Sequence, residues 1–164
     1  MIFVTVGTHE QQFNRLIEEI DRLKGNGTIK DEVIMQTGYC TYKPKYCKWS
    51  ELLPYDQMLE NVEKADIVIT HGGPSSFIMP LQIGKIPIVV PRQKRYDEHV
   101  NNHQIQIVEN FNMQGFIIGI KDVEELENAI NKIPNFKPNK YKTNTQSRHM
   151  AKTVCLLFVE WRSL

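Results

Sequence analysis

Short apolar runs alternate with amphipathic segments along residues 2–133. Runs rich in β-branched residues predict strands at 2–6, 32–36, a short stretch that ends at Leu53, 66–70, 87–91 and 116–120. Apolar residues at helical spacing predict helices at about 11–23, 54–64, 97–110 and 123–133, with a further helix opened by 71–76. Strands that alternate with helices predict an α/β fold, a doubly wound parallel sheet covered on both faces.

The pattern changes after residue 133. Residues 1–133 form the predicted α/β domain, and residues 134–147 are rich in Asn, Lys, Pro and Thr, as in a linker-like crossing of the surface. An amphipathic helix is predicted at 148–164, where Val154, Leu157, Phe158 and Trp161 recur at helical spacing. This helix would either dock on a partner or pack back onto its own sheet.

Composition narrows the class of protein. The 164 residues carry a net charge of +1 without a basic stripe, which argues against a nucleic-acid partner. The N-terminus is typical of a first strand and not of a signal peptide, and the late apolar run 154–159 is far shorter than the ~20 residues that span a bilayer. Cys40, Cys47 and Cys155 fit no zinc spacing. Cys40 and Cys47 could pair, but free thiols in a reducing cytosol are the simpler interpretation.

The segment 70–76 is the strongest candidate for a binding site. Ligands of parallel sheets bind at the carboxyl ends of strands, where helix N-termini present N–H groups to anions. His71 is followed there by Gly72 and Gly73, which would let the backbone approach a phosphate, and by Ser75 and Ser76, which would add hydroxyl donors or cap the helix. A tight turn with a serine cap explains the segment equally well. It is neither a Walker A loop nor a G-x-G-x-x-G fingerprint.

A second glycine-bearing strand end lies at the start of the chain. Gly7 and Thr8 follow the first strand, so that two such ends could hold a diphosphate between them. His9 would be a base, a phosphate donor or simply a surface residue at a helix start.

Two further segments carry polar or aromatic side chains at predicted strand ends. Arg92, Glu98, His99, Asn102 and Gln104 form a polar cluster suited to sugar hydroxyls, although a solvated helix start is the alternative. His99 and His103 are an i,i+4 pair, but the H-E-x-x-H order and a third ligand are missing, so we expect no metal. The corner at 53–55 offers Leu53 and Tyr55 to a flat base or to the core.

Together these segments resemble the C-terminal domain of family 28 glycosyltransferases, one half of the GT-B fold. The resemblance covers roughly residues 1–133 and includes H-x-G-x-x-S after A-D-I-V-I-T at 65–76 and G-K-I-P-I-V-V-P at 84–91. Within that family the chain is similar to the single-domain Alg13-like and PssE-type subunits. Their features are V-T-V-G-T at 4–8, Phe-x-x-Leu-Ile at 13–17, and Pro-Arg at 91–92 followed by Glu-His-x-x-x-His-Gln at 98–104.

The resemblance implies a UDP-sugar donor, a lipid-diphosphate-linked saccharide acceptor and a membrane-anchored Alg14- or PssD-like partner that supplies the other half. It implies that the donor phosphates lie by Gly7, Thr8, Gly72, Gly73, Ser75 and Ser76. Leu53 and Tyr55 would border the uracil, and Glu98 and His99 would contact the donor hexose, with Asn102 matching the family's Asn shortly after them. We take His9, Glu98 and His99 as the candidate catalytic residues, and His71, Arg92, Asn102 and Gln104 as candidate substrate contacts. Met79 stands where the wider family has a ribose-binding Glu, with Gln82 one turn on as a substitute.

The expected function is therefore that of an inverting glycosyltransferase subunit in capsule or exopolysaccharide synthesis, at the inner face of the membrane through its partner. No metal or other cofactor is expected, because no D-x-D strand end is present and backbone amides could stabilise the leaving UDP. A non-catalytic UDP-sugar-binding or regulatory module is the alternative. A UDP-sugar epimerase would need both halves in one chain. Galactose is favoured as the sugar, with glucuronic acid and N-acetylglucosamine open.

Overall fold

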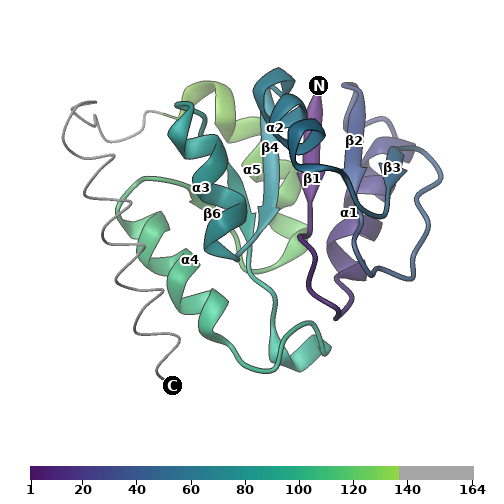
Figure 1. Ribbon diagram of the computed structural model, residues 1–164. Coiled ribbons are helices and arrows are strands. Elements are labelled where there is room, and N and C mark those ends of the chain that lie inside the picture. Colours follow the sequence, from purple (N-terminus) through teal and green to yellow (C-terminus); the bar gives the residue numbers. More distant parts are fainter. Residues whose placement is uncertain (137–164) are drawn as a thin grey trace.

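The chain is a layered α/β structure in a computed structural model that describes residues 1–136 (Figure 1). Its elements are β1 (Ile2–Thr5), α1 (Asn14–Gly25), β2 (Val33–Gln36), β3 (Lys48–Ser50), α2 (Tyr55–Lys64), β4 (Ile67–His71), α3 (Pro74–Gln82), β5 (Ile88–Val90), η1 (Lys94–Tyr96), α4 (His103–Met113), β6 (Ile118–Gly119), η2 (Val123–Glu125), α5 (Leu126–Lys132) and η3 (Ile133–Asn135). The predicted helix at 148–164 and nearly all of the linker-like crossing lie outside the described residues, as does Cys155.

All six strands pair in parallel, in the order β3-β2-β1-β4-β5-β6. β1 lies in the middle, where Ile2 pairs with Val33 of β2 on one side and with Ile67 of β4 on the other. The chain runs outward from β1 in one direction and then outward from β4 in the other. In such sheets ligands bind where the strand order reverses, at the carboxyl ends of the strands. The carboxyl ends of β1 and β4 are therefore the expected place of a ligand site.

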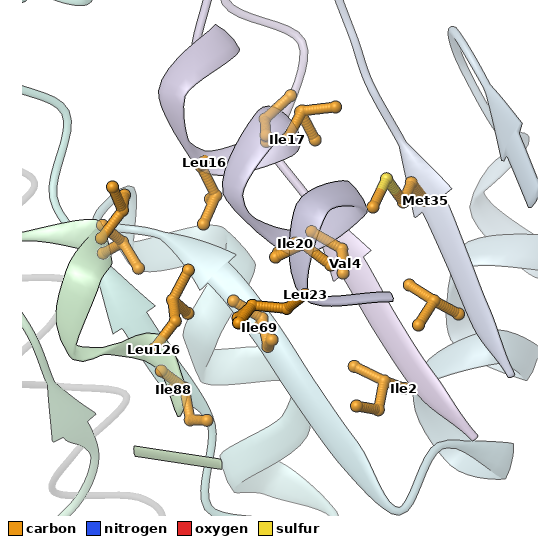
Figure 2. Packing of buried hydrophobic residues seen from close by; sticks show 14 of the residues in the cluster. Ile2, Val4, Leu16, Ile17, Ile20, Leu23, Met35, Ile69, Ile88 and Leu126 are labelled. Atoms are coloured by element: carbon orange, nitrogen blue, oxygen red, sulfur yellow. The ribbon is translucent and has the colours of Figure 1, made fainter. Parts of the chain in front are cut away.

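Alternating residues of the strands supply the two faces of the sheet. Ile2, Val4 and Ile69 face α1 and α5 in the largest core cluster, which Figure 2 shows around Leu16, Ile20 and Leu126. The intervening strand residues face α2, α3 and α4 in two smaller clusters, for example Phe3 with Val62 and Val89 with Phe77. Helices thus cover both faces, and the predicted doubly wound parallel sheet is confirmed.

Two local predictions were wrong. The fourth long helix begins at His103 and not at 97, because the chain first makes the turn η1 and Asp97 adopts a left-handed conformation with φ of 56°. The serines do not cap α3: its cap residue is Gly73, Pro74 occupies the first turn, and Ser75 and Ser76 lie inside the helix. The predicted first-turn position of Pro74 is confirmed.

The two described cysteines, Cys40 and Cys47, are free and buried. The Cys40 sulfur accepts a hydrogen bond from the backbone N–H of Phe13 at 3.3 Å. Within residues 1–136, no helix has the length and apolar character needed to cross a membrane. The same range contains no group of three or more His, Cys, Asp or Glu side chains placed to hold a metal ion.

Candidate functional site

The imidazole of His71 fills the space between the two glycine-bearing strand ends. His71 is the last residue of β4 and is 92% buried, with a relative exposure of 8%. A Cβ built on Gly7 would lie 2.5 Å from Cε1 of His71, and one built on Gly73 would collide with Nε2. Gly7 also has a φ of 75°, which side chains rarely tolerate. The absence of side chains at Gly7 and Gly73 therefore makes room for the His71 ring, whether or not a ligand also binds there.

Gly72 makes room for a different side chain. A Cβ at this position would lie 3.0 Å from Cβ of Gln104, which comes from the first turn of α4. The Gln104 side-chain oxygen accepts the backbone N–H of Arg92 at 3.0 Å. Gln104 therefore links α4 to the end of β5 and is only 8% exposed.

Two further histidines meet at this edge of the sheet. The rings of His9 and His99 have centroids 5.1 Å apart and are tilted by 37°. Burial lowers the pKa of both imidazoles, and the nearby Arg92 lowers it further. Burial, with a smaller contribution from Arg92, lowers the pKa of His71 to about 3. His71 is thus neutral at physiological pH, and Ser76 Oγ lies 3.5 Å from its Nε2.

Arg92 lies below this edge and is fully buried. Its guanidinium donates to the backbone oxygens of Val6, Gln11, Gln12 and Glu98 at 2.8–3.2 Å. The sequence predicted Arg92 as a substrate contact, but these bonds direct its side chain into the protein. Arg92 therefore stabilises the loops that follow β1 and β5.

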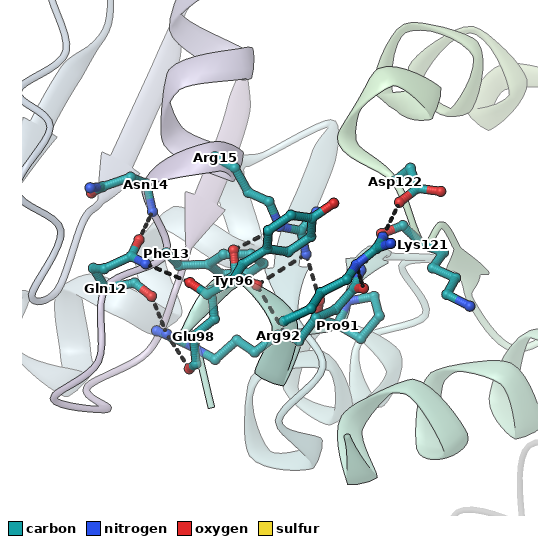
Figure 3. Close-up of polar contacts among 12 residues, drawn as sticks. Gln12, Phe13, Asn14, Arg15, Pro91, Arg92, Tyr96, Glu98, Lys121 and Asp122 are labelled. Carbon is teal, nitrogen blue, oxygen red and sulfur yellow. Dashed lines mark hydrogen bonds and ion pairs between the residues drawn. The ribbon is translucent and has the colours of Figure 1, made fainter. Parts of the chain in front are cut away.

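Glu98 is also turned inward, with 1% exposure. Its carboxylate forms a two-point ion pair with Arg15 of α1, with Nε to Oε1 at 2.7 Å, and accepts the backbone N–H of Gln93 (Figure 3). Burial raises the pKa of Glu98, and Arg15 opposes this shift. The predicted catalytic carboxylate is therefore engaged in holding the β5–α4 loop against α1.

The loop is fixed on its other side as well. Arg95 pairs with Asp122 at 2.8 Å, and Gln93 donates to the backbone oxygen of Lys121. The centroid of the Tyr96 ring lies 4.6–4.8 Å from the guanidinium carbons of Arg15 and Arg95, and Figure 3 shows Tyr96 beside Arg15. The sequence did not predict this clamp, in which Arg15 and Asp122 hold the β5–α4 loop from two sides. Its central pair is an arginine early in α1 and a carboxylate far along the chain, Arg15 and Glu98. Neither spacing nor periodicity in the sequence indicates that such distant residues pair.

A polar cavity of about 380 Å³ adjoins the clamp, lined among others by Gln12, Arg15, Glu18, Tyr96 and Glu98. Of the predicted site residues, only Glu98 lines it. The cavity is therefore separate from the glycine-bearing edge around His71.

Other predicted site residues differ in exposure. Thr8, Ser75 and Asn102 are exposed, and the Asn102 side-chain oxygen accepts the backbone N–H of Lys94 at 2.9 Å. Tyr55 opens α2 with 72% of its surface exposed, whereas Leu53 packs beside Phe3 in the core. Tyr55 therefore remains available to a ligand, and Leu53 serves mainly the fold.

The chain matches the glycosyltransferase family 28 C-terminal domain over residues 1–155. It belongs to this family. The strand order, the glycine-bearing ends of β1 and β4 and the His71 segment are thus features of a family 28 domain, as the sequence resemblance predicted.

The relatives of this family 28 domain include subunits named UDP-N-acetylglucosamine transferase subunit ALG13. The chain is 30% identical to the human protein over 105 residues, which are 64% of this chain and 8% of that protein. It is 31% identical to the Candida albicans protein over 80 residues, which cover 49% of this chain and 26% of that one. The chain thus spans only a small part of the length of these relatives.

Solved structures show the same fold. The glycotransferase of kitacinnamycin superposes with a TM-score of 0.58 at 19% identity, covering 80% of this chain and 34% of that one. The glycosyltransferase SnogD from Streptomyces nogalater superposes with a TM-score of 0.51 at 18% identity, again over 80% and 34%. The family 28 domain therefore has the architecture of one half of a GT-B glycosyltransferase.

Met79 stands where the sequence resemblance leads us to expect a ribose-binding Glu. It lies on α3 and packs against the cluster of Phe3, Val62 and Val68, between α3 and α2. Gln82, the proposed substitute for ribose binding, is exposed at the end of α3.

Proposed function

We propose that this chain is the donor-binding subunit of a UDP-sugar-dependent inverting glycosyltransferase, and that it is active with a membrane-anchored partner of the Alg14 or PssD kind. One observation carries the proposal. Two glycine-bearing strand ends and the N-terminus of α3 meet at the point where the strand order reverses, in a family 28 domain. Helix N-termini at that point favour phosphate groups.

The diphosphate would lie along the exposed Thr8 and Ser75 and the half-buried Ser76, beside the neutral imidazole of His71. Tyr55, exposed at the start of α2, would border the uracil. His9 and His99 would face the transferred hexose. Glu98 would act on the hexose indirectly, since its carboxylate is bound to Arg15.

The acceptor would be a lipid-diphosphate-linked saccharide, in capsule or exopolysaccharide synthesis, and the chain would reach the inner face of the membrane through its partner. For the sugar, likeness to capsule transferases favours galactose. The ALG13 relatives, which are named as UDP-N-acetylglucosamine transferase subunits, favour N-acetylglucosamine instead. A donor-hydrolysis assay over a panel of UDP-sugars, with the partner present, separates these two and glucuronic acid.

The test of the binding site is calorimetry with UDP. The variant Gly73→Val would block the approach of a phosphate to the backbone, but its side chain would collide with His71 even without a ligand. The double variant Ser75→Ala/Ser76→Ala is therefore the sharper probe of phosphate binding. We expect its UDP affinity to fall by at least about tenfold, because each hydroxyl hydrogen bond to a charged group contributes about 1.5–3 kcal/mol. The matched control is Thr28→Ala, an exposed hydroxyl in the α1–β2 loop at the opposite edge of the sheet.

If the folded serine variant binds UDP with unchanged affinity, the diphosphate does not bind at the N-terminus of α3. UDP binding without transfer for any UDP-sugar, partner present, would favour the non-catalytic module.

A further inference from the structure

Arg92 connects two loops that are far apart in the sequence. Its guanidinium donates to Val6, Gln11 and Gln12 of the β1–α1 segment and to Glu98 of the β5–α4 loop. The guanidinium carbon also lies 5.0 Å from the ring centroid of Phe13. These two loops carry His9 and His99, whose rings meet at 5.1 Å. Arg92 thus ties together the two loops that carry these rings.

The charge of Arg92 is balanced in an unusual way. All four of its guanidinium hydrogen bonds within the described residues go to neutral backbone oxygens. The carboxylate of Glu98, which lies close by, is held by Arg15 in a two-point ion pair. Burial lowers the pKa of Arg92 to about 10, so the group is still cationic at neutral pH. A buried cation held by dipoles projects its field further than one neutralised by a carboxylate.

We propose that Arg92 is a positioning residue of the donor site: its guanidinium fixes the β1–α1 and β5–α4 loops and supplies buried positive charge to the edge where the diphosphate would lie. Within the proposed function this charge attracts the donor phosphates and stabilises the leaving UDP without touching either. It also adds to the effect of burial in lowering the pKa values of His9 and His99. The arrangement differs from a direct phosphate contact, because the guanidinium is covered by the loops that it holds.

Several titratable groups share this field. Those that interact with Arg92 or with the imidazoles beside it are His9, Glu10, Cys40, His71, Glu98, His99 and His103. Of these, Glu10 opposes the effect of Arg92 on His9, and His103 adds to it at His99. Changes in the titration of His9 and His99 therefore report on the charge at position 92 once the other groups are kept constant.

The experiment compares Arg92→Lys, which keeps the charge, with Arg92→Met, which removes it, in the full chain. The matched control is Arg22→Met, an exposed arginine of α1 that pairs with Glu19. Three quantities are measured: the free energy of unfolding, the imidazole pKa values of His9 and His99 by NMR, and the affinity for UDP by calorimetry. We expect both Arg92 variants to lose stability, because each abandons carbonyl partners.

The charge separates the two variants. In Arg92→Met we expect the pKa values of His9 and His99 to rise and UDP affinity to fall by about tenfold or more. In Arg92→Lys we expect the pKa values to stay near those of the unmodified chain and affinity to stay within about threefold. Arg22→Met should alter neither.

Equal losses of affinity in both variants without a change in the imidazole pKa values would reduce Arg92 to a packing role and overturn the proposal. If Arg92→Met does not fold, Arg92→Lys decides: retained affinity supports the role of the charge, and lost affinity with native folding overturns it. If the unmodified chain binds no UDP, the proposed function fails. The imidazole titration then still tests whether Arg92 supplies charge to this edge.

Discussion

At the scale of single residues, His71 and the glycines beside it form one packing unit. Gly73 has φ of −73° and ψ of 124°, a conformation open to any residue, so the close His71 ring and not the backbone conformation excludes a side chain there. The sequence singled out these glycines for close approach to a phosphate, which stays a prediction, and it did not indicate their contact with the His71 ring. Periodicity and motif spacing cannot show which side chain fills the space left by a glycine.

Gly73→Ala should therefore lower the free energy of unfolding by about 1–3 kcal/mol through overpacking. In the double variant His71→Ala/Gly73→Ala the loss should be clearly smaller than the sum of the two single losses, because the new methyl group enters the space of the removed ring. Urea denaturation of the four proteins measures this coupling.

Gly84→Ala serves as the control, since Gly84 has a φ of 79° but open space around it. Its cost should add to that of His71→Ala without coupling. Strict additivity for Gly73→Ala as well would disprove the contact between Gly73 and His71.

The buried imidazole also predicts a pH dependence. The pKa of His71 is lowered to about 3 in the fold, against 6.5 when unfolded, so the unfolded chain binds the proton more readily. The contribution of the neutral ring is present above pH 6.5 and is lost progressively as the pH falls toward 3. His71→Gln cannot take up this proton, so its stability should fall less steeply over that window. Denaturation midpoints at several pH values, with the exposed His103→Gln as control, provide the measurement.

At the scale of elements, the β2–β3 loop is held by one buried carboxylate from α1. Asp21 has no exposed surface and accepts the backbone N–H groups of Lys45, Tyr46 and Cys47 and the hydroxyl of Tyr42. Burial by itself would raise the pKa of Asp21, but these donors lower it below its usual value. An aspartate in the middle of an amphipathic helix gives no sequence signal for such a role.

Asp21→Asn should therefore lose about 1–3 kcal/mol of unfolding free energy at neutral pH, because the amide cannot accept all of these donors. The contribution of Asp21 should be complete above its unfolded pKa of about 3.9 and decline as the pH falls through the lower folded pKa. Thermal unfolding at pH 7 and in acid measures both effects. Asp31→Asn, an exposed position after α1, should change neither.

Elements themselves were largely predictable. The strands β1, β2, β4 and β5 follow β-branched runs, and their two faces follow from alternation of residues such as Val4 and Phe3. The start of α4 was misplaced because contacts of Arg92 and Glu98 with distant segments fold residues 97–102 back toward α1. Helical spacing carries no information about such tertiary contacts.

At the scale of the whole molecule, the sheet presents its carboxyl edge as one side of an expected cleft. The family match covers one half of a GT-B architecture, and the superposed structures are about three times longer than the part they share with this chain. We therefore expect the isolated chain to bind UDP but to transfer sugar only with its partner. Calorimetry on the isolated chain measures UDP binding, and a coupled assay with and without the partner measures sugar transfer.

Removal of residues 148–164 tests where the partner docks. We expect the truncated chain to fold and bind UDP while losing co-purification with the partner, because the apolar stripe of that predicted helix suits an interface. Global unfolding would instead make this segment part of the core, and undiminished association would remove it from the interface.

The packing of His71 has a consequence for how this sequence can diverge. A smaller side chain at position 71 would free position 73 to accept a Cβ, whereas position 7 would still favour glycine because of its φ of 75°. Substitutions at 71 and 73 should therefore be accepted in pairs and in a fixed order, with the histidine replaced first. A selection for folded variants in which one substitution compensates for another would therefore randomise the codons of positions 71 and 73 and keep glycine at position 7.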